Sequence, residues 1–120
     1  MAVVGCDNGS INSKEIDPLF RGKWEVKSVE FKGTTYTFPC LIQSIYCSSG
    51  GWEVGSTTIK LYVNGNVESN EGRIHTVGNS FYNSTGDWRG DVQVNGNDAI
   101  LTLPGGEKDY CIKVSKFTWE

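Results

Sequence analysis

The residue types of this chain favour strands over helices so strongly that they limit its fold more than any other feature. β-branched and aromatic residues (Val, Ile, Thr, Phe, Tyr and Trp) account for 42 of the 120 residues, whereas Ala, Leu and Met together account for 8. The first group suits a pleated, half-buried surface, and the second favours helices. This imbalance excludes an all-α fold and argues against a βαβ fold. A chain of 120 residues is expected to form one domain.

Turn-forming residues separate short stretches in which apolar and polar residues alternate. The stretch 57–63 is followed by Asn64-Gly65, the strongest short-range hairpin signal, and residues 95–98 (Asn-Gly-Asn-Asp) form a second such turn. Turns at this spacing are typical of an antiparallel meander. The sequence therefore predicts an all-β, up-and-down meander of about eight or nine strands.

The first and last predicted strands both change their apolar face partway along. In residues 23–31, Trp24 falls on one face and Val29 on the other, which predicts a β-bulge near residues 27 and 28. A similar change occurs within residues 109–119. Bends in the first and last strands allow a meander to curl until these strands pair, so we expect a closed β-barrel. A two-sheet β-sandwich is the alternative.

The N-terminal residues resemble a processing signal. Val-Val-Gly-Cys at residues 3–6 is similar to the end of the lipobox of bacterial lipoproteins, in which the Cys is acylated, and this makes Cys6 a lipidation candidate. The polar residues 7–13 have the composition of a tether. We divide the chain into a flexible segment, residues 1–17, and a barrel domain, residues 18–120. This hypothesis predicts a protein of the cell envelope or exterior that contacts a membrane only through a lipid anchor; the alternative is an ordinary stretch of chain before a folded domain.

The four Cys residues favour disulfides over a metal site. None lies in a Cys-x-x-Cys pair, and the chain has one His, so zinc-type spacing is absent and no metal is expected. If Cys6 is acylated, the disulfide candidates are Cys40, Cys47 and Cys111, with one thiol left over. Cys40 and Cys47 could close a hairpin and are the favoured pair, while pairing of Cys111 with Cys47 or Cys6 stays open. This usage suits an oxidising compartment.

Four short motifs occur in the order found in lipocalins and their short bacterial relatives. They are Gly22-Lys23-Trp24, Asn64-Gly65-Asn66-Val67, Thr85-Gly86-Asp87-Trp88 and the closing Tyr110-Cys111-Ile112. The chain thus resembles a bacterial lipocalin-like domain from Gly22 to Trp119. The resemblance implies a β-barrel in which Gly22 and Trp24 form a structural motif, with Trp24 packed across the closed end.

Aromatic side chains in strand-like stretches are the candidate ligand contacts. Tyr62, Tyr82, Trp88 and Tyr110 could line a cavity, because a Tyr or Trp ring combines an apolar surface with a polar atom. The alternative is that these rings are the core of a small domain. Trp52 falls in a predicted glycine-rich loop, so we consider it a contact for a protein partner.

Catalytic motifs are absent from the sequence. It has no nucleophile elbow, P-loop or His-Glu-x-x-His segment, so we expect a protein that is not an enzyme and needs no cofactor. A net charge of −3 with mixed signs argues against nucleic-acid binding. Two functions remain. One is a lipocalin-like module that binds a small apolar or amphipathic ligand, and the alternative is a filled-core β-barrel that serves as a protein-interaction or structural domain.

Overall fold

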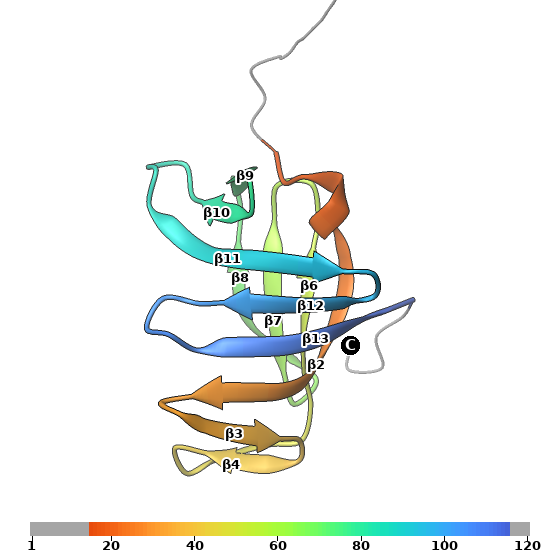
Figure 1. Ribbon diagram of the computed structural model, residues 1–120, viewed down its shortest axis with the longest axis vertical. Helices are drawn as coiled ribbons and strands as arrows, with labels where there is room; N and C mark the ends of the chain where they lie inside the picture. The colour runs from red at the N-terminus through yellow and green to blue at the C-terminus, as the bar shows by residue number, and fades with distance from the viewer. Residues whose placement is uncertain (1–14, 116–120) are drawn as a thin grey trace, which may run out of the picture.

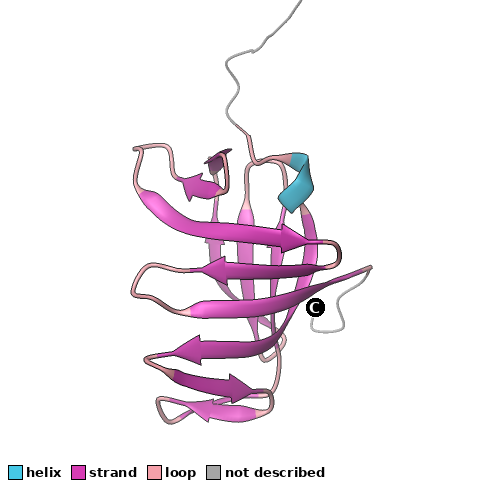
Figure 2. Cartoon of the chain, in the orientation of Figure 1, coloured by secondary structure: helices cyan, strands magenta, loops and turns pink. Residues whose placement is uncertain are grey.

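A computed structural model describes residues 15–115, and its strands form an antiparallel sheet that curls into a half barrel (Figures 1 and 2). A 3₁₀ helix, η1 (Pro18–Phe20), precedes the strands β2 (Gly22–Phe31), β3 (Thr34–Thr37), β4 (Cys40–Ile42), β5 (Ile45–Cys47), β6 (Gly50–Val54), β7 (Ile59–Val63), β8 (Asn66–Glu71), β9 (His75–Val77), β10 (Ser80–Tyr82), β11 (Trp88–Asn95), β12 (Asp98–Thr102) and β13 (Lys108–Val114). Cys6 and most of the predicted change of face in the last strand lie outside the described residues.

The strand order is that of a meander whose first and last strands pair. The sheet runs β8-β7-β6-β2-β13-β12-β11-β10-β9, with β3 joined to β2 and with β4 and β5 in a separate hairpin. In the β2–β13 pair, Trp24 lies opposite Lys113 and Tyr110 lies opposite Ser28. The predicted all-β antiparallel meander and the pairing of its first and last strands are confirmed.

The predicted bulge in the first strand is also confirmed. Opposite the consecutive residues Tyr110 and Cys111, β2 presents Ser28 and Val26, so Lys27 is the extra residue. An extra residue resets the two-residue period of a strand. Val26 and Val29 consequently both face the buried interior, although a regular strand would place them on opposite faces.

The same bulge marks a fork at the other edge of β2. Before Lys27, residues Gly22–Glu25 pair with β6, and after it, residues Ser28–Phe31 pair with β3. The β6–β8 strands and the β3–β5 strands therefore leave β2 in different directions. In Figure 1, β11 to β13 run across the front, while β6 to β8 run behind them.

The half barrel has two free ends, β8 and β9, which do not pair with each other within residues 15–115. Side chains cross part of this seam, since the Arg89 guanidinium of β11 contacts the Glu71 carboxylate of β8 at 2.7 Å. In the segment between β8 and β9, the backbone N–H of Ile74 donates to the carbonyl of Thr57 at 2.9 Å, and Ile74 is fully buried. The sheet is thus held across the seam by isolated contacts instead of a ladder.

Residues on the N-terminal side of Pro18 belong to the packed domain. Ile16 is fully buried, and its N–H donates to the carbonyl of Ser56 at 2.7 Å. Trp24 is buried nearby, and its Nε1 donates to the carbonyl of Phe20 at 3.0 Å. The packed part of the chain therefore includes residues that we assigned to the flexible segment. Residues 15–115 contain no helix with the length and hydrophobicity of a membrane span.

Trp52 corrects one prediction, because it lies in β6 and not in a loop. Its side chain is 9% exposed and forms part of the core. The prediction of a loop was based on Gly50 and Gly51, but both residues belong to the strand β6. The ring of Phe38 covers Gly50 so closely that an added Cβ would lie 2.9 Å from it.

Candidate functional site

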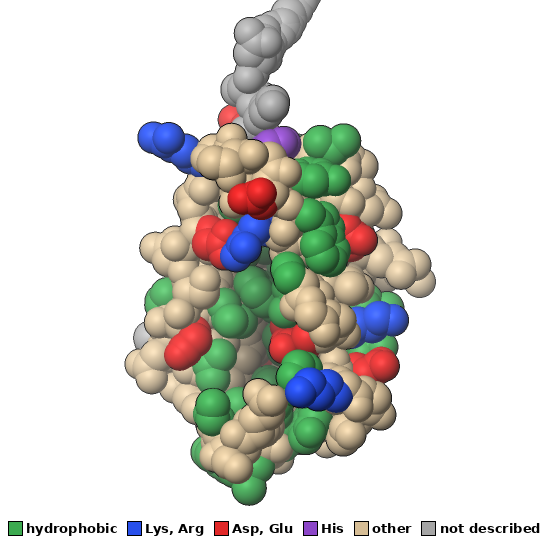
Figure 3. All heavy atoms as spheres, turned by 90° about the vertical axis from the view of Figure 1, so that its left-hand side faces the viewer, with side chains coloured by type: hydrophobic (Ala, Val, Ile, Leu, Met, Phe, Trp, Pro, Cys, Tyr) green, Lys and Arg blue, Asp and Glu red, His purple; other side chains and the backbone are tan. Residues whose placement is uncertain are grey.

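The inside of the half barrel contains an apolar pocket of about 260 Å³, here called the lower pocket. It lies between β2, β13, β6–β8 and the β4–β5 hairpin, below the fork in β2. Figure 3 faces the open side and shows a hollow among hydrophobic side chains, with acidic side chains close to it. The lower pocket is lined by Val26, Val29, Phe38, Ile42, Gln43, Ile45, Cys47, Gly50, Leu61, Tyr62, Val63, Glu68, Glu107 and Asp109.

Asp109 is the most unusual of these residues, because it occupies a core position. In the sheet it lies between Val29 of β2 and Leu101 of β12, and all three side chains are buried. Asp109 itself is 3% exposed. Strand alternation therefore directs a carboxyl group into an apolar interior, where a charged group is costly unless it is paired.

Only one oxygen of this carboxyl has a donor. The indole Nε1 of Trp52 donates to Oδ2 at 2.9 Å, but Oδ1 accepts no hydrogen bond from any residue that the structure describes. Burial raises the pKa of Asp109 to about 8, and the neighbouring Glu107 carboxyl raises it further, against the opposing effect of Trp52. At neutral pH the Asp109 carboxyl is thus mostly protonated and carries a hydrogen that Glu107 can accept.

Two further acidic residues face the pocket. Glu107 comes from the turn before β13, and Glu68 comes from β8 on the other side. Burial raises the pKa of the Cys47 thiol, and the charges of nearby Cys40, Glu107 and Glu68 add to this effect. Among the described residues that line the lower pocket there is no Lys, Arg or His. The polar groups of the pocket therefore create a negative potential.

A second pocket, of about 220 Å³, lies higher along the seam. Arg89 and Glu71 stand at its edge, and Phe81, Leu101 and Trp52 form part of its wall. The hydrogen bond from Trp52 to Asp109 stands between the two pockets, since Trp52 lines the upper one and Asp109 the lower one. The interior is thus divided, and its lower part has the more apolar lining.

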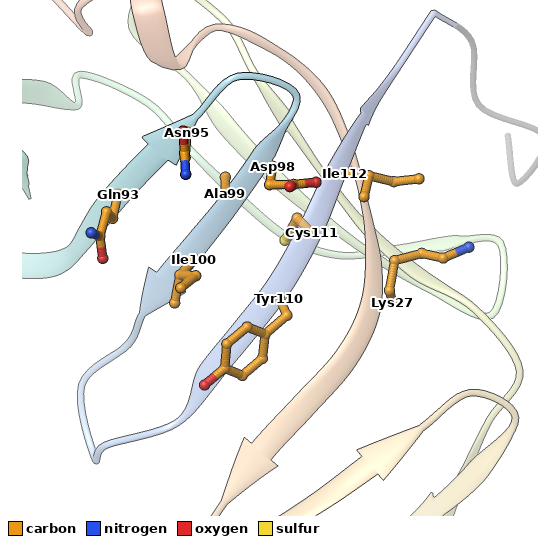
Figure 4. Close-up of a pocket in the computed structure, with 9 residues that line it drawn as sticks. All are labelled: Lys27, Gln93, Asn95, Asp98, Ala99, Ile100, Tyr110, Cys111 and Ile112. Atoms are coloured by element: carbon orange, nitrogen blue, oxygen red, sulfur yellow. The ribbon is translucent and has the colours of Figure 1, made fainter.

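A third depression, of about 380 Å³, lies on the outer face of β11 to β13 (Figure 4). Tyr110 stands there with polar residues that include Gln93 and Asn95. The Tyr110 hydroxyl donates to the Glu30 carboxylate at 2.9 Å, and this contact raises the pKa of Tyr110. The predicted ligand contact Tyr110 is therefore separated from the lower pocket by the sheet.

The other predicted ligand contacts are not gathered in one cavity either. Tyr62 is buried beside the lower pocket, but its hydroxyl donates to Glu53 at 3.1 Å. The ring of Tyr82 stacks on His75 with centroids 6.0 Å apart. Trp88 is exposed, and its Nε1 donates to Asp91 at 2.8 Å. Of the four aromatic candidates, the structure places only Tyr62 at the lower pocket.

The predicted hairpin around Cys40 and Cys47 is present, without a disulfide. These residues lie directly opposite each other in the β4–β5 pair, and both are free thiols, as is Cys111. Burial raises the pKa of Cys111 above the ordinary thiol range, and the charge of Asp109 acts in the same direction. Within residues 15–115, no cluster of His, Cys, Asp or Glu has the composition of a metal site.

Asp109 and Glu107 are the functional candidates that sequence reasoning missed. Tyr110 and Ile112 look like the apolar face of β13 in the sequence, but Asp109 and Cys111 on the other face are the buried residues. A signal was available, because Asp109 and Cys111 alternate with Tyr110 and a buried Cys marks the inner face.

Comparisons with known proteins add no assignment. No protein-family model, no curated protein and no solved structure matches the chain.

Proposed function

We propose that this protein is a non-enzymatic, lipocalin-like binding module that holds a small apolar or amphipathic molecule in the lower pocket. The observation that carries this proposal is a largely apolar cavity inside the sheet, lined by side chains such as Val29, Leu61 and Val63. Small-molecule sites are concave, mostly apolar and supplied with few polar groups. A volume of about 260 Å³ suits a ligand smaller than the molecules that fill typical sites of ~300–1,000 Å³.

Closure of the sheet into a complete barrel is part of this proposal. The pairing of β2 with β13 and the ion pair across the seam support it, since both bring the two halves of the sheet together. A position in the cell envelope or outside the cell, with Cys6 as lipid anchor, remains part of the same proposal. Acylated Cys6, found by mass spectrometry after expression with the upstream gene sequence, would support the anchor.

The test is a titration with a neutral fluorescent probe, N-phenyl-1-naphthylamine, against the protein and two matched variants. Val63→Phe places a ring in the lower pocket, and Val77→Phe makes the same change at an exposed position of β9. We expect saturable binding at one site in the wild type and in Val77→Phe, and a loss of at least tenfold in affinity in Val63→Phe. Absence of binding to a folded wild-type protein would refute the proposal.

A protein-interaction domain is the second candidate function. It is favoured by two large apolar side chains that are exposed on the β4–β5 hairpin, Leu41 and Tyr46, which lie directly opposite each other in the strand pair. Exposed apolar side chains that are adjacent in this way are typical of a contact site. If the probe fails to bind, replacing Leu41 and Tyr46 by Ser and measuring self-association by analytical ultracentrifugation examines one form of this alternative.

A further inference from the structure

The polar groups of the lower pocket carry information about its ligand that the apolar walls do not. The part of the lining that the structure describes includes three carboxyl groups, those of Asp109, Glu107 and Glu68, and no basic side chain. An acidic cluster alone is common on protein surfaces. Here it includes the carboxyl of Asp109, which is 3% exposed, lines the pocket and has one oxygen that accepts no hydrogen bond from residues 15–115.

We propose, building on the function proposed above, that the lower pocket selects an amphipathic amine, whose ammonium group is held by Asp109 and Glu107 while its apolar part fills the pocket. An ammonium group supplies up to three donors, and the carboxyl groups of Asp109 and Glu107, which both line the pocket and hydrogen-bond to each other, offer the acceptors. The Trp52 indole holds Oδ2 at 2.9 Å and so fixes the orientation of the carboxyl before a ligand arrives.

Charge complementarity distinguishes an amine from other headgroups. A carboxylate ligand would meet the like charges of Glu107 and Glu68, and no Lys, Arg or His of residues 15–115 lines the pocket to offset them. An alcohol could hydrogen-bond to Asp109, but it would not gain the attraction of the charges. Hydrogen bonds with an ionised partner are about twice as strong as neutral ones, so the order of affinity is amine, alcohol, carboxylate.

The apolar walls set the position of the ligand. Two strands supply much of the apolar wall of the pocket: β2 contributes Val26 and Val29, and β7 contributes Leu61 and Val63. A ligand whose amino group lies at Asp109 would therefore direct its hydrocarbon part along these strands. Burial of each methylene group favours binding whatever the headgroup, so the headgroup comparison requires probes with one common tail.

The experiment is isothermal titration calorimetry with octylamine, 1-octanol and octanoate at pH 8.5. This pH lies above the pKa of about 8 of Asp109, and a primary amine with a pKa of ~10.4, as in Lys, is still charged. We expect octylamine to bind about tenfold or more tightly than octanol, with octanoate the weakest. Val63→Phe should weaken the binding of all three probes.

Variants that neutralise one charge each identify the carboxyl group that binds the ammonium. Glu107→Gln and Asp109→Asn should each lower octylamine affinity about tenfold and leave octanol affinity within about twofold. Glu25→Gln, on the outer side of β2, removes the same charge outside the pocket and should change neither. It controls for the overall charge of the protein.

Each outcome separates this inference from the function on which it rests. If none of the three probes binds to the folded protein, the proposed binding function is wrong. If octanol binds as tightly as octylamine, or octanoate binds more tightly, the pocket stands and the amine assignment is overturned. An amine preference that persists in both Glu107→Gln and Asp109→Asn would also overturn the assignment, because the selecting charge would then lie elsewhere.

Discussion

Replacing Asp109 by Asn is expected to stabilise the protein at neutral pH and to change its stability little in mild acid. Asn has nearly the shape of a protonated Asp, and its amide oxygen can still accept the hydrogen bond from Trp52. It carries no charge at any pH. The perturbation therefore removes one property of Asp109, its ability to ionise, and leaves the surrounding contacts in place.

The sign follows from the direction of the pKa shift. Burial raises the pKa of Asp109 from 3.8 to about 8 on folding. A raised pKa gives a stabilising contribution that is complete below about pH 4 and is lost as the pH rises toward 8, because only the unfolded chain releases the proton in this window. Between pH 3.8 and pH 7 the loss is on the order of 4 kcal/mol, at about 1.4 kcal/mol per pH unit.

Urea unfolding, followed by Trp fluorescence at several pH values between 4.5 and 8, measures this effect. The free energy of unfolding of Asp109→Asn minus that of the wild type should increase steadily with pH, since other titrating groups cancel in the difference. Asp91→Asn is a control of opposite sign, because hydrogen bonds from Ser80 and Trp88 lower the pKa of Asp91. That variant should be destabilised at neutral pH and recover as the pH falls. A difference for Asp109→Asn that is flat or falls with pH would refute the reasoning.

Three other perturbations examine the fold around the site. Gly90→Ala should destabilise the protein by about 2–3 kcal/mol in thermal or urea unfolding. The reason is that φ of Gly90 is +138° and the new Cβ would lie 2.8 Å from a backbone oxygen. The control variant Gly78→Ala also has a positive φ, but its Cβ would enter open space, so it should cost only about 1 kcal/mol. Breaking the half-exposed Arg89–Glu71 ion pair should cost under about 1 kcal/mol in a double-mutant cycle, and a larger coupling energy would show that the seam depends on it. Cys111 should react with a thiol reagent only on unfolding, as peptide mapping would show, because its thiol is buried and its pKa is raised; rapid labelling of the native protein would contradict this.

The parts of the fold that local patterns determine could be predicted from the sequence. The change of apolar face in β2 required an extra residue, and the structure has it at Lys27. The hairpin at Asn64-Gly65 followed from two residues that tolerate a positive φ, and both have one, 54° and 84°. In each case the constraint acts within a few residues of the chain, so the sequence alone is sufficient.

The free ends of the sheet could not be predicted in the same way. β9 and β10 have three residues each, whereas β8 has six, so the strands on the two sides of the seam differ in length. Between them, Ile74 is buried and hydrogen-bonds to Thr57 instead of continuing a ladder. Whether two strands that are adjacent in sequence pair depends on such tertiary contacts, which no alternation pattern shows.

The candidate site could not be predicted from the sequence, because both faces of β13 carry apolar residues. Tyr110 and Ile112 on one face are more hydrophobic by composition than Asp109 and Cys111 on the other, and yet the second face is buried. Where the two faces of a strand do not differ clearly in polarity, its sequence specifies orientation weakly. The neighbours decide here, because Asp109 shares its row with Val29 and Leu101, which are both buried.

The bulge at Lys27, which the sequence predicts, bears directly on the lower pocket, which the sequence does not predict. By resetting the period of β2, it turns Val29 inward, and Asp109 lies directly opposite Val29 in the adjacent strand. The same bulge separates the stretch of β2 that pairs with β6 from the stretch that pairs with β3. Strands that diverge from a fork leave a space between them, and this space is where the lower pocket and its buried carboxyl lie. The extra residue in β2 therefore lies where the two strand pairs diverge, and it aligns Asp109 with Val29 of the apolar wall.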